Sequence, residues 1–383
     1  MGLSFLARKP DSGLGNIRSS PGDPSRNVDW VLLGTQVILT IIGCFIVYSA
    51  SWTRVPGDPY VFVTRQVVFA IAASVVMVIV MSVDYEWFKE RAAMLYAATI
   101  ALLMLLLLMG IAARDNRISF DLGPINVQPA ELAKFTTLIA LAAFLADERT
   151  GEVSYVRFLG GLIMVGAPSV LIIAQPDLGS ASVIVTIAMG VLLVAGAKAK
   201  YIGLISFLAI STVGAAFVGG FVNDYQKERF RVFFGQTADE DSVYQVRNAI
   251  RAVGTGGIRG NGWLNGQLTN DGSVPVMWAD FPFAAVGEQF GLIGCSVLLL
   301  LFVVALARIW RIATLSRDLL GTYLCAGVFT MLLWQVFQNV GMTLGIMPVT
   351  GLPMPFISYG GSSLLTYFAL FGIVQSVHMR RMR

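Results

Sequence analysis

Charged residues are scarce in this 383-residue chain. Asp, Glu, Lys and Arg together make up 13% of it, the hydrophobic residues AVILMFWYC make up 56%, and the mean hydropathy is +0.72. So few charges cannot cover the water-facing surface of a soluble protein of this size. The composition therefore indicates a membrane protein.

Histidine and cysteine are also nearly absent. The one histidine, His378, lies in a basic tail, so the chain cannot supply a histidine-rich metal site or a catalytic triad away from that tail. The three cysteines, Cys44, Cys295 and Cys325, lie within hydrophobic runs, which favours buried thiols over a disulfide framework. Acid–base chemistry must therefore use carboxylates.

Hydrophobic segments long enough to cross a bilayer as helices recur along the chain. We predict an all-α polytopic membrane protein with about ten transmembrane helices and a long extracytoplasmic loop between spans 7 and 8. Residues 1–28 are polar and carry no signal-peptide core, so we expect a disordered cytoplasmic tail. Spans 1–7 then occupy 29–222, the loop 223–282, and spans 8–10 with a short basic cytoplasmic tail 283–383. The predicted spans are 30–50, 63–83, 93–113, 128–146, 158–174, 178–196, 201–222, 283–307, 319–343 and 361–378.

The distribution of basic residues predicts the orientation. With both termini cytoplasmic, 16 of the 27 Lys and Arg residues fall in inside segments and 4 in short outside segments. The basic residues are spread over loops and not clustered with aromatic residues, so no nucleic-acid partner is expected. Contacts with membrane lipids are expected instead.

Ionisable side chains in or beside spans are costly and therefore mark candidate functional sites. Glu131 and Lys134 lie three residues apart at the start of span 4, where they can pair. They either simply start the helix or line a cavity in which Lys134 holds an anion. Asp177 caps span 6 after a tight turn, or adds a carboxylate at the same level as Glu131.

The long loop and its end supply further candidates. Arg247, Arg251 and Arg259 flank a glycine-rich stretch, 254–266, and could contact phosphate oxygens, although a mobile linker explains this composition equally well. Asp280 lies between Trp278 and Phe281. That setting would desolvate the carboxylate and raise its pKa towards the range of a general base, unless Asp280 is only a helix N-cap.

A proline-rich segment without charge, 345–363, precedes the last span. Irregular backbone at membrane depth is tolerated where it lines a cavity. The composition therefore predicts a segment that dips back into the bilayer and lines a cavity.

Five separated motifs, in order through all ten predicted spans, resemble the SEDS family (shape, elongation, division and sporulation), which comprises RodA, FtsW and SpoVE proteins. The motifs are Gln128-Pro-Ala-Glu131, Gln175-Pro-Asp-Leu-Gly179, the glycine-rich stretch 254–266, Ala279-Asp-Phe281 followed by Gly287-Glu288, and Ser358-Tyr-Gly-Gly-Ser-Ser363.

The resemblance implies a peptidoglycan glycosyltransferase of the bacterial plasma membrane that polymerises lipid II outside the membrane, beside a class B penicillin-binding protein. The essential aspartate of the family carries over to Asp280. The stretch 260–266 and the short tails look more like the RodA branch, which serves cell elongation, than the FtsW branch, which serves division. The matching substrate-binding residues are Gln128, Glu131, Lys134, Gln175, Asp177 and Glu288, with Ser358, Tyr359 and Ser362 from the last motif.

The implied reaction joins a lipid-pyrophosphate-linked glycan to the 4-hydroxyl of the N-acetylglucosamine of lipid II. As a hypothesis, Asp280 takes the hydroxyl proton. Lys134, the loop arginines or a divalent cation, Mg²⁺ or Mn²⁺, would stabilise the departing pyrophosphate. No organic cofactor is expected, and the sequence does not identify the metal.

The chain departs from the family pattern at three places. An Arg-Trp pair usually precedes Asp121-Leu-Gly123, whereas this chain has Ile118-Ser119, with Arg117 one position early. Gln-Pro-Ser-Glu is replaced by Gln128-Pro-Ala-Glu131, and His-Thr before the aspartate by Trp278-Ala279. These differences bear on the role of the missing tryptophan and on the local hydrogen bonds around Asp280, and they do not remove the carboxylate itself.

Two other functions remain open from the sequence. A flippase for the lipid-linked precursor would use the same polar groups as a passage, although the chain shows no internal repeat. A non-catalytic scaffold for a cell-wall synthase would tolerate loss of the Asp280 carboxylate.

Overall fold

The computed structural model describes residues 27–55, 57–113, 118–121, 126–147, 153–219, 227, 233 and 240–382. Residues 1–26 of the predicted tail and 15 residues of the predicted loop 223–282 therefore lie outside the described residues, as do Arg117 and Gly123.

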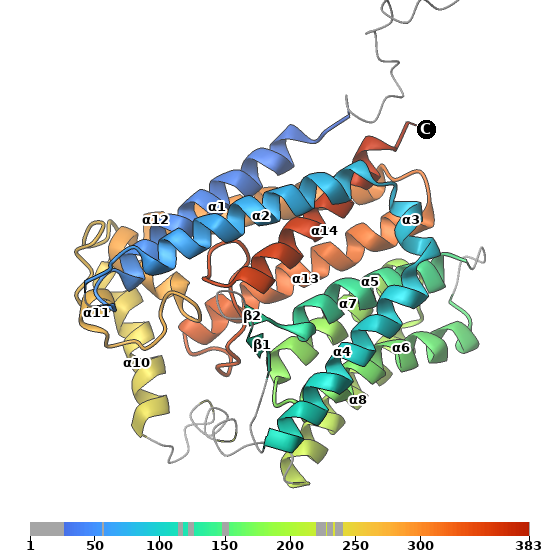
Figure 1. The fold of residues 1–383 in the computed structure, drawn as a ribbon, viewed down its shortest axis with the longest axis horizontal. Coiled ribbons are helices and arrows are strands. Elements are labelled where there is room, and N and C mark those ends of the chain that lie inside the picture. Colours follow the sequence, from blue (N-terminus) through green and yellow to red (C-terminus); the bar gives the residue numbers. More distant parts are fainter. Residues whose placement is uncertain are drawn as a thin grey trace, which may run out of the picture.

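Ten long helices coincide with the ten predicted spans (Figure 1). Eight are long and apolar enough to cross a membrane, and α7 and α8 are apolar but have shorter hydrophobic stretches. The prediction of a polytopic all-α membrane protein is thus confirmed. The helices are α1 (Trp30–Ser51), α2 (Val61–Ser82), α4 (Ala92–Ala113), α5 (Pro129–Ala146), α6 (Tyr155–Ala174), α7 (Leu178–Val194), α8 (Ala199–Val218), α12 (Pro282–Thr314), α13 (Leu319–Thr343) and α14 (Gly361–Met379).

Burial separates the central helices from the peripheral ones. About four-fifths of the hydrophobic windows of α5 and α14 is buried inside the protein, whereas only about one-fifth of those of α2 and α4 is buried. The exposed side chains of α2 and α4 are mainly Val, Ile, Leu and Met, which suit a lipid environment. In Figure 1, α14 lies between α2 and α13, and α13 also packs against α7 and α12.

Elements that the sequence did not predict lie between the spans. They are α3 (Tyr85–Glu90), α10 (Glu240–Gly256), α11 (Gln267–Asp271) and an antiparallel pair of two-residue strands, β1 (Phe120–Asp121) and β2 (Asn126–Val127). The helix α10 is amphipathic and packs against α12, so much of the described part of the long loop is ordered helix.

The glycine-rich stretch packs against a break in α12. Gly291 has φ 64° and ψ −159°, a conformation essentially restricted to glycine, and it interrupts the helical hydrogen bonds. A Cβ atom on Gly260 would lie 2.2 Å from the Gln289 carbonyl oxygen, so this close backbone contact requires glycine. Four backbone bonds satisfy the break: from the amides of Asn261 and Gly262 to the carbonyls of Glu288 and Gln289, and from the amides of Leu292 and Ile293 to those of Gly257 and Ile258.

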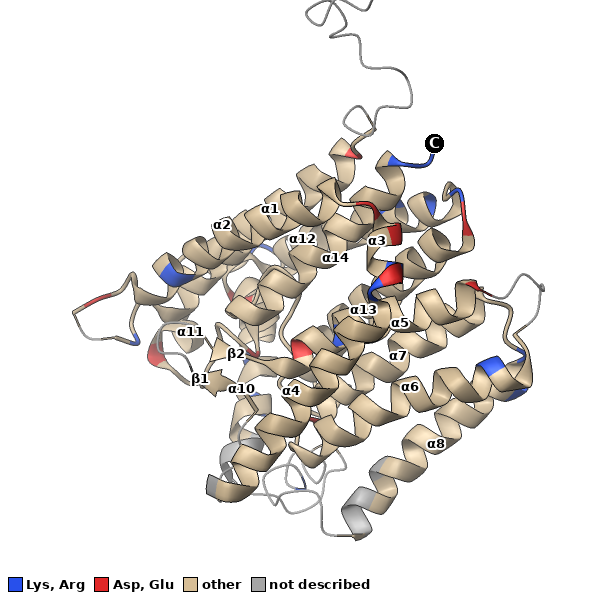
Figure 2. Ribbon diagram, turned by 45° about the vertical axis from the view of Figure 1, so that its right-hand side comes forward, with Lys and Arg blue, Asp and Glu red and all other residues tan. Residues whose placement is uncertain are grey.

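The first span begins at the same side of the bundle at which the last span finishes. The Asp29 amide donates to Gln375 Oε1 at 3.0 Å, and Gln375 Nε2 donates to the Asp29 carbonyl at 2.9 Å. Arg308 donates to both carboxylate oxygens of Asp29. Figure 2 shows charged residues lying mostly near the helix ends. We call the end that carries Asp29 the terminal end and the opposite end the cavity end.

Candidate active site

Asp280 lies at the cavity end, two residues before α12 begins. The N-cap of α12 is Phe281, and it makes no side-chain capping bond, so the interpretation of Asp280 as a helix cap is wrong. The Asp280 amide donates to the Val276 carbonyl at 3.0 Å, and its carbonyl accepts from Asn339 Nδ2 at 2.9 Å. Its backbone is therefore held from two directions.

Aromatic side chains hold the turn that carries Asp280. The centroid of the Trp278 ring lies 4.9 Å from that of Phe62 on α2, and the Phe62 centroid lies 5.2 Å from that of Tyr359. The Tyr359 amide donates to the Trp278 carbonyl at 2.9 Å. Tyr359, two residues before α14, and Trp278, two residues before Asp280, are thus tied together.

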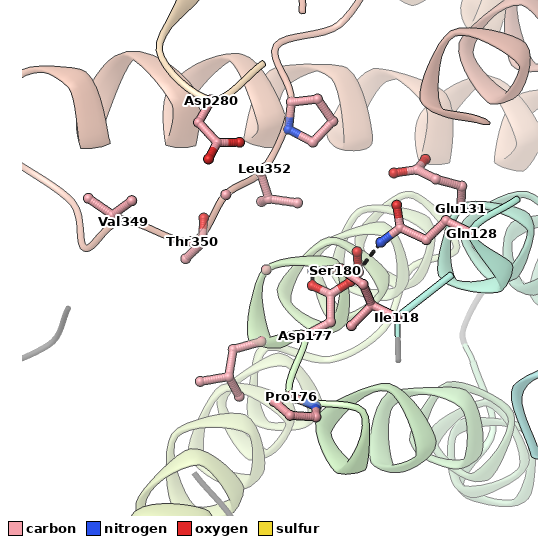
Figure 3. Close-up of a pocket in the computed structure, with 14 residues that line it drawn as sticks. Ile118, Gln128, Glu131, Pro176, Asp177, Ser180, Asp280, Val349, Thr350 and Leu352 are labelled. Atoms are coloured by element: carbon pink, nitrogen blue, oxygen red, sulfur yellow. Dashed lines mark hydrogen bonds between the residues drawn. The ribbon is translucent and has the colours of Figure 1, made fainter. Parts of the chain in front are cut away.

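A cavity of about 330 Å³ opens beside Asp280. Figure 3 shows the Asp280 carboxylate on one side of it, and Gln128, Glu131 and Asp177 on the other. The volume lies within the range of small-molecule sites. The lining comprises Ile118, Gln128, Glu131, Pro176, Asp177, Leu178, Gly179, Ser180, Asp280, Val349, Thr350, Gly351, Leu352 and Pro353.

Gln128 joins three elements at the cavity. It is the N-cap of α5, and Pro129 follows in the first turn, where proline is favoured. Gln128 Nε2 donates to Asp177 Oδ2 at 3.1 Å, the bond drawn in Figure 3, and its amide donates to Ser362 Oγ at 3.2 Å. Ser362 in turn donates to the Asn126 carbonyl at 2.5 Å.

Glu131 and Lys134 form the pair that their spacing predicts. Lys134 Nζ lies 2.6 Å from Glu131 Oε1, and the two side chains are 0% and 2% exposed. Glu131 Oε2 has no hydrogen-bond partner among the described residues. Glu131 lines the cavity, whereas Lys134 lies behind it and is already engaged. Lys134 can hold a substrate anion only by giving up this pair.

The turn between α6 and α7 divides its polar residues between two roles. Asp177 is the N-cap of α7, with Oδ1 accepting from the Ser180 amide at 2.9 Å, and it also lines the cavity. Both interpretations of Asp177 therefore apply. Gln175 is buried and donates to the Leu103 carbonyl at 2.7 Å, so it ties the turn to α4 and does not line the cavity.

Glu288 lies apart from the cavity lining. Its carboxylate is buried and accepts from the amides of Leu268 and Thr269 at 2.8 Å each, and from the Thr269 hydroxyl at 2.5 Å. These bonds anchor α11 on α12. Glu288 therefore has a structural role.

The remaining predicted residues are also outside the lining. Arg247 and Arg251 are exposed on α10, and Arg259 is exposed just after it. Ser358 Oγ accepts from the Met354 amide at 2.7 Å, and Tyr359 packs against rings of α2. Ser358 and Tyr359 thus hold the segment before α14 in position.

The proline-rich segment forms a wall of the cavity, as its composition predicts. Thr350 and Leu352 lie in this wall, and both were missed as individual candidates. Ser180 was missed as well, although its place in the first turn of α7 beside Asp177 was the available signal. Ile118, which replaces part of the Arg-Trp pair of the family, lines the cavity too.

The described residues do not form a metal site by themselves. Among them, no three or more His, Cys, Asp or Glu side chains are grouped so as to hold a metal ion, although Glu131, Asp177 and Asp280 line one cavity. Mg²⁺ commonly binds through one or two carboxylates together with substrate phosphates. A divalent cation would therefore need the substrate as a ligand.

Comparisons with known proteins match this chain over nearly its whole length. A family model described as cell cycle protein (FtsW/RodA/SpoVE) matches residues 29–383. Stage V sporulation protein E of Bacillus subtilis is 33% identical over 91% of this chain and 96% of that protein. Peptidoglycan glycosyltransferase MrdB of Escherichia coli is 29% identical over 93% of this chain and 94% of that protein.

Solved structures match as well. A crystal structure of the rod shape determining protein RodA of Thermus thermophilus has a TM-score of 0.69 and 27% identity, and the match covers 93% of this chain and 98% of that chain. A chain in the structure of a peptidoglycan synthase complex, concerned with coordination of polymerization and crosslinking, has a TM-score of 0.75 and 28% identity, with 93% and 99% covered.

Proposed function

This chain belongs to the FtsW/RodA/SpoVE family of cell cycle proteins, and we propose that it is a peptidoglycan glycosyltransferase that polymerises lipid II in the cavity beside Asp280. The observation that carries the site assignment is the position of the Asp280 carboxylate on a cavity of about 330 Å³, facing a wall of polar side chains (Figure 3). The relative named peptidoglycan glycosyltransferase MrdB supports the activity.

The cavity suits a neutral, hydroxyl-bearing sugar. Among the residues that the structure describes, its lining holds three carboxylates, Glu131, Asp177 and Asp280, and no basic side chain. Gln128, Ser180 and Thr350 add groups that can exchange hydrogen bonds with hydroxyls. The acceptor end of lipid II, which carries the free 4-hydroxyl, therefore fits the cavity. The lipid tails would lie along the apolar outer helix faces.

Asp280 acts as the general base in this proposal. Its carboxylate takes the proton of the acceptor hydroxyl as that oxygen bonds to the anomeric carbon of the growing glycan. The bond from the anomeric carbon to the pyrophosphate oxygen breaks, and the pyrophosphate leaves with the electron pair. One base and an activated leaving group suffice, so the carboxylate pair of a glycosidase is not required.

The leaving pyrophosphate needs positive charge from outside the lining. Carboxylates would repel it, and Lys134 is paired with Glu131. The exposed Arg247, Arg251 and Arg259, or a divalent cation bound mainly through the pyrophosphate, would supply that charge. We propose these as substrate-binding groups in place of Lys134.

The cavity end faces outwards in this proposal. The excess of Lys and Arg in the segments on the terminal side supports cytoplasmic termini in the bacterial plasma membrane. The match to a chain of a peptidoglycan synthase complex supports a class B penicillin-binding protein as partner. The sequence of the stretch 260–266 favours a RodA-like role in elongation, and FtsW-like division is the alternative.

A lipid-precursor flippase is the second candidate, favoured by the buried Glu131–Lys134 pair. Purified protein mixed with labelled lipid II in detergent separates the two, because polymerisation needs no sealed bilayer whereas flipping does. Glycan polymer formed in detergent supports the proposal. Transport of lipid II across vesicles, without any polymer in detergent or vesicles, contradicts it.

A further inference from the structure

One buried amide joins two neighbouring segments that line the cavity. Asn339, on α13, is 0% exposed. Its Nδ2 donates to the Asp280 carbonyl at 2.9 Å and to the Leu352 carbonyl at 3.0 Å. Asp280 ends the long loop, and Leu352 belongs to the proline-rich wall. Both residues line the cavity, and Asn339 itself does not.

The chemistry of the two bonds fixes the orientation of the Asn339 amide. An NH2 group has two hydrogens, and here each has a carbonyl acceptor. A flipped amide would bring Oδ1 against two carbonyl oxygens. In the observed orientation Oδ1 is buried without a hydrogen-bond partner among the described residues, which costs free energy. The side chain keeps both bonds donated by Nδ2 despite this cost.

A neighbouring side chain holds one of the two segments independently. Gln338 Nε2 donates to the Pro348 carbonyl at 3.1 Å and to Thr350 Oγ1 at 3.2 Å. The proline-rich wall is thus fixed to α13 without Asn339. What Asn339 adds is the tie between this wall and the backbone of Asp280.

We propose that Asn339 is a positioning residue for the glycosyl transfer, acting through Asp280. This inference rests on the proposed function, in which the Asp280 carboxylate is the general base and the acceptor hydroxyl lies against the opposite wall. The shared amide holds the backbone of Asp280 against the proline-rich segment and so fixes the position of the base in the cavity. A shift of about 1 Å in reacting groups can cost about 100-fold in rate. Asn339 contacts no reacting atom, so its effect falls on turnover more than on substrate binding.

The test compares two substitutions of buried amide side chains by leucine on one helix. Asn339→Leu keeps the branched side-chain shape and removes both donor bonds. Gln335→Leu is the matched control, because Gln335 is also 0% exposed, lies one turn earlier on α13, and has no side-chain hydrogen bond among the described residues. With purified protein and lipid II in detergent, we expect Asn339→Leu to lower kcat about 10- to 100-fold with KM within about threefold. Gln335→Leu should stay within about twofold in both constants.

Asn339→Asp provides a graded second variant in case Asn339→Leu does not fold. A buried, unpaired carboxyl stays protonated, so one O–H donor replaces two N–H donors. Its kcat should lie between those of Asn339→Leu and the wild type. Rates are expressed per folded molecule, so a purely structural role predicts lost folded protein with unchanged kcat. That result, or a loss confined to KM, would overturn the positioning role.

Asp280→Asn, assayed in parallel, separates failure of this inference from failure of the proposed function. A normal rate in Asp280→Asn overturns the base assignment on which the inference rests. A lost rate in Asp280→Asn together with a normal kcat in Asn339→Leu overturns the positioning role alone. Loss of kcat in both Asp280→Asn and Asn339→Leu, with Gln335→Leu unaffected, supports the base assignment and the positioning role together.

Discussion

Glu131 and Lys134 form an ion pair inside the helical bundle, with Lys134 Nζ 2.6 Å from Glu131 Oε1 and both side chains almost completely buried. Buried charges are costly unless they are paired, so each side chain depends on the other for its burial at this depth. The pair lies against the wall of the cavity that contains Asp280. It contributes the shape and charge of that wall and leaves no free ammonium group there.

Breaking this pair on one side should destabilise the protein strongly. Lys134→Met leaves Glu131 buried without its partner, and we expect a loss of about 3–5 kcal/mol, seen as a lower melting temperature in detergent. The double variant Glu131→Gln with Lys134→Met removes both charges and should recover most of that loss. Lys89→Met is the control, since Lys89 pairs with Asp147 at the same 2.6 Å but in an exposed setting, and should cost less than about 1 kcal/mol. Equal losses in the two single variants would contradict this account.

Asp177 combines helix capping with a place in the cavity, and two substitutions separate these roles. Asn is as good an N-cap as Asp, whereas Ala removes the bond to the Ser180 amide. We expect Asp177→Ala to lose about 1 kcal/mol of stability and Asp177→Asn to remain within about 0.5 kcal/mol of the wild type. Polymerisation by folded Asp177→Asn then reports the loss of the carboxylate charge together with the loss of the bond from Gln128 Nε2. A melting temperature as low for Asp177→Asn as for Asp177→Ala would show that the cap is not what holds the turn.

Gly291 should not tolerate a side chain. A Cβ atom there would lie 2.4 Å from the Gly260 amide nitrogen, and its φ and ψ are essentially restricted to glycine. We expect Gly291→Ala to separate the glycine-rich stretch from α12 and to lower the melting temperature markedly. Gly34→Ala is the control, because Gly34 in α1 has open space around its Cβ position, and alanine is the better helix former by about 1 kcal/mol. A normal melting temperature for Gly291→Ala would contradict the observed packing.

Asp29 should make the stability of the terminal end depend on pH in the acid range. Burial raises the pKa of Asp29, but hydrogen bonds from Arg308 and from the Leu32 amide outweigh it, so the pKa lies below its ordinary value of 3.8. A carboxyl with a depressed folded pKa stabilises the protein above its unfolded pKa, and this contribution is lost as the pH falls from 3.8 through the folded pKa.

Asp29→Asn therefore should lower the melting temperature by a constant amount above this range, and the difference from wild type should shrink as the pH falls below 3.8. Asp58→Asn, at an exposed position between α1 and α2, should follow the wild-type curve. A difference between wild type and Asp29→Asn that grows towards low pH would have the wrong sign for this ion pair.

The sequence predicted the spans well because their signal is local. Length and hydropathy alone located all ten, and most ends agree within two residues. The start of α6 differs by three residues and the end of α8 by four. The largest difference is at α12, which continues to Thr314 and not 307, because its polar last turns project beyond the hydrophobic window. Hydropathy could not locate α10, whose apolar face is covered by α12 and whose mean hydropathy resembles that of a loop.

The candidate site was predicted in part. Asp280, Glu131, Gln128 and Asp177 come together because each lies at a span boundary on the same side of the membrane. Glu288 is also a carboxylate at the start of a span, but tertiary hydrogen bonds from α11 engage it, and nothing in its neighbours along the chain indicates that. Asn339 could not be identified from sequence, since its role depends on contacts 59 and 13 residues away.

The most direct test of the account measures lipid II polymerisation by purified Asp280→Asn beside purified Asp271→Asn. Asp271 is an exposed carboxylate of the same loop and lies outside the cavity lining, so it controls for the general loss of an acidic group. With both variants folded and bound to lipid II like the wild type, the account predicts that Asp280→Asn makes no glycan polymer and that Asp271→Asn makes it at the normal rate. Polymer formation by Asp280→Asn at the wild-type rate would contradict the assignment of Asp280 as the general base.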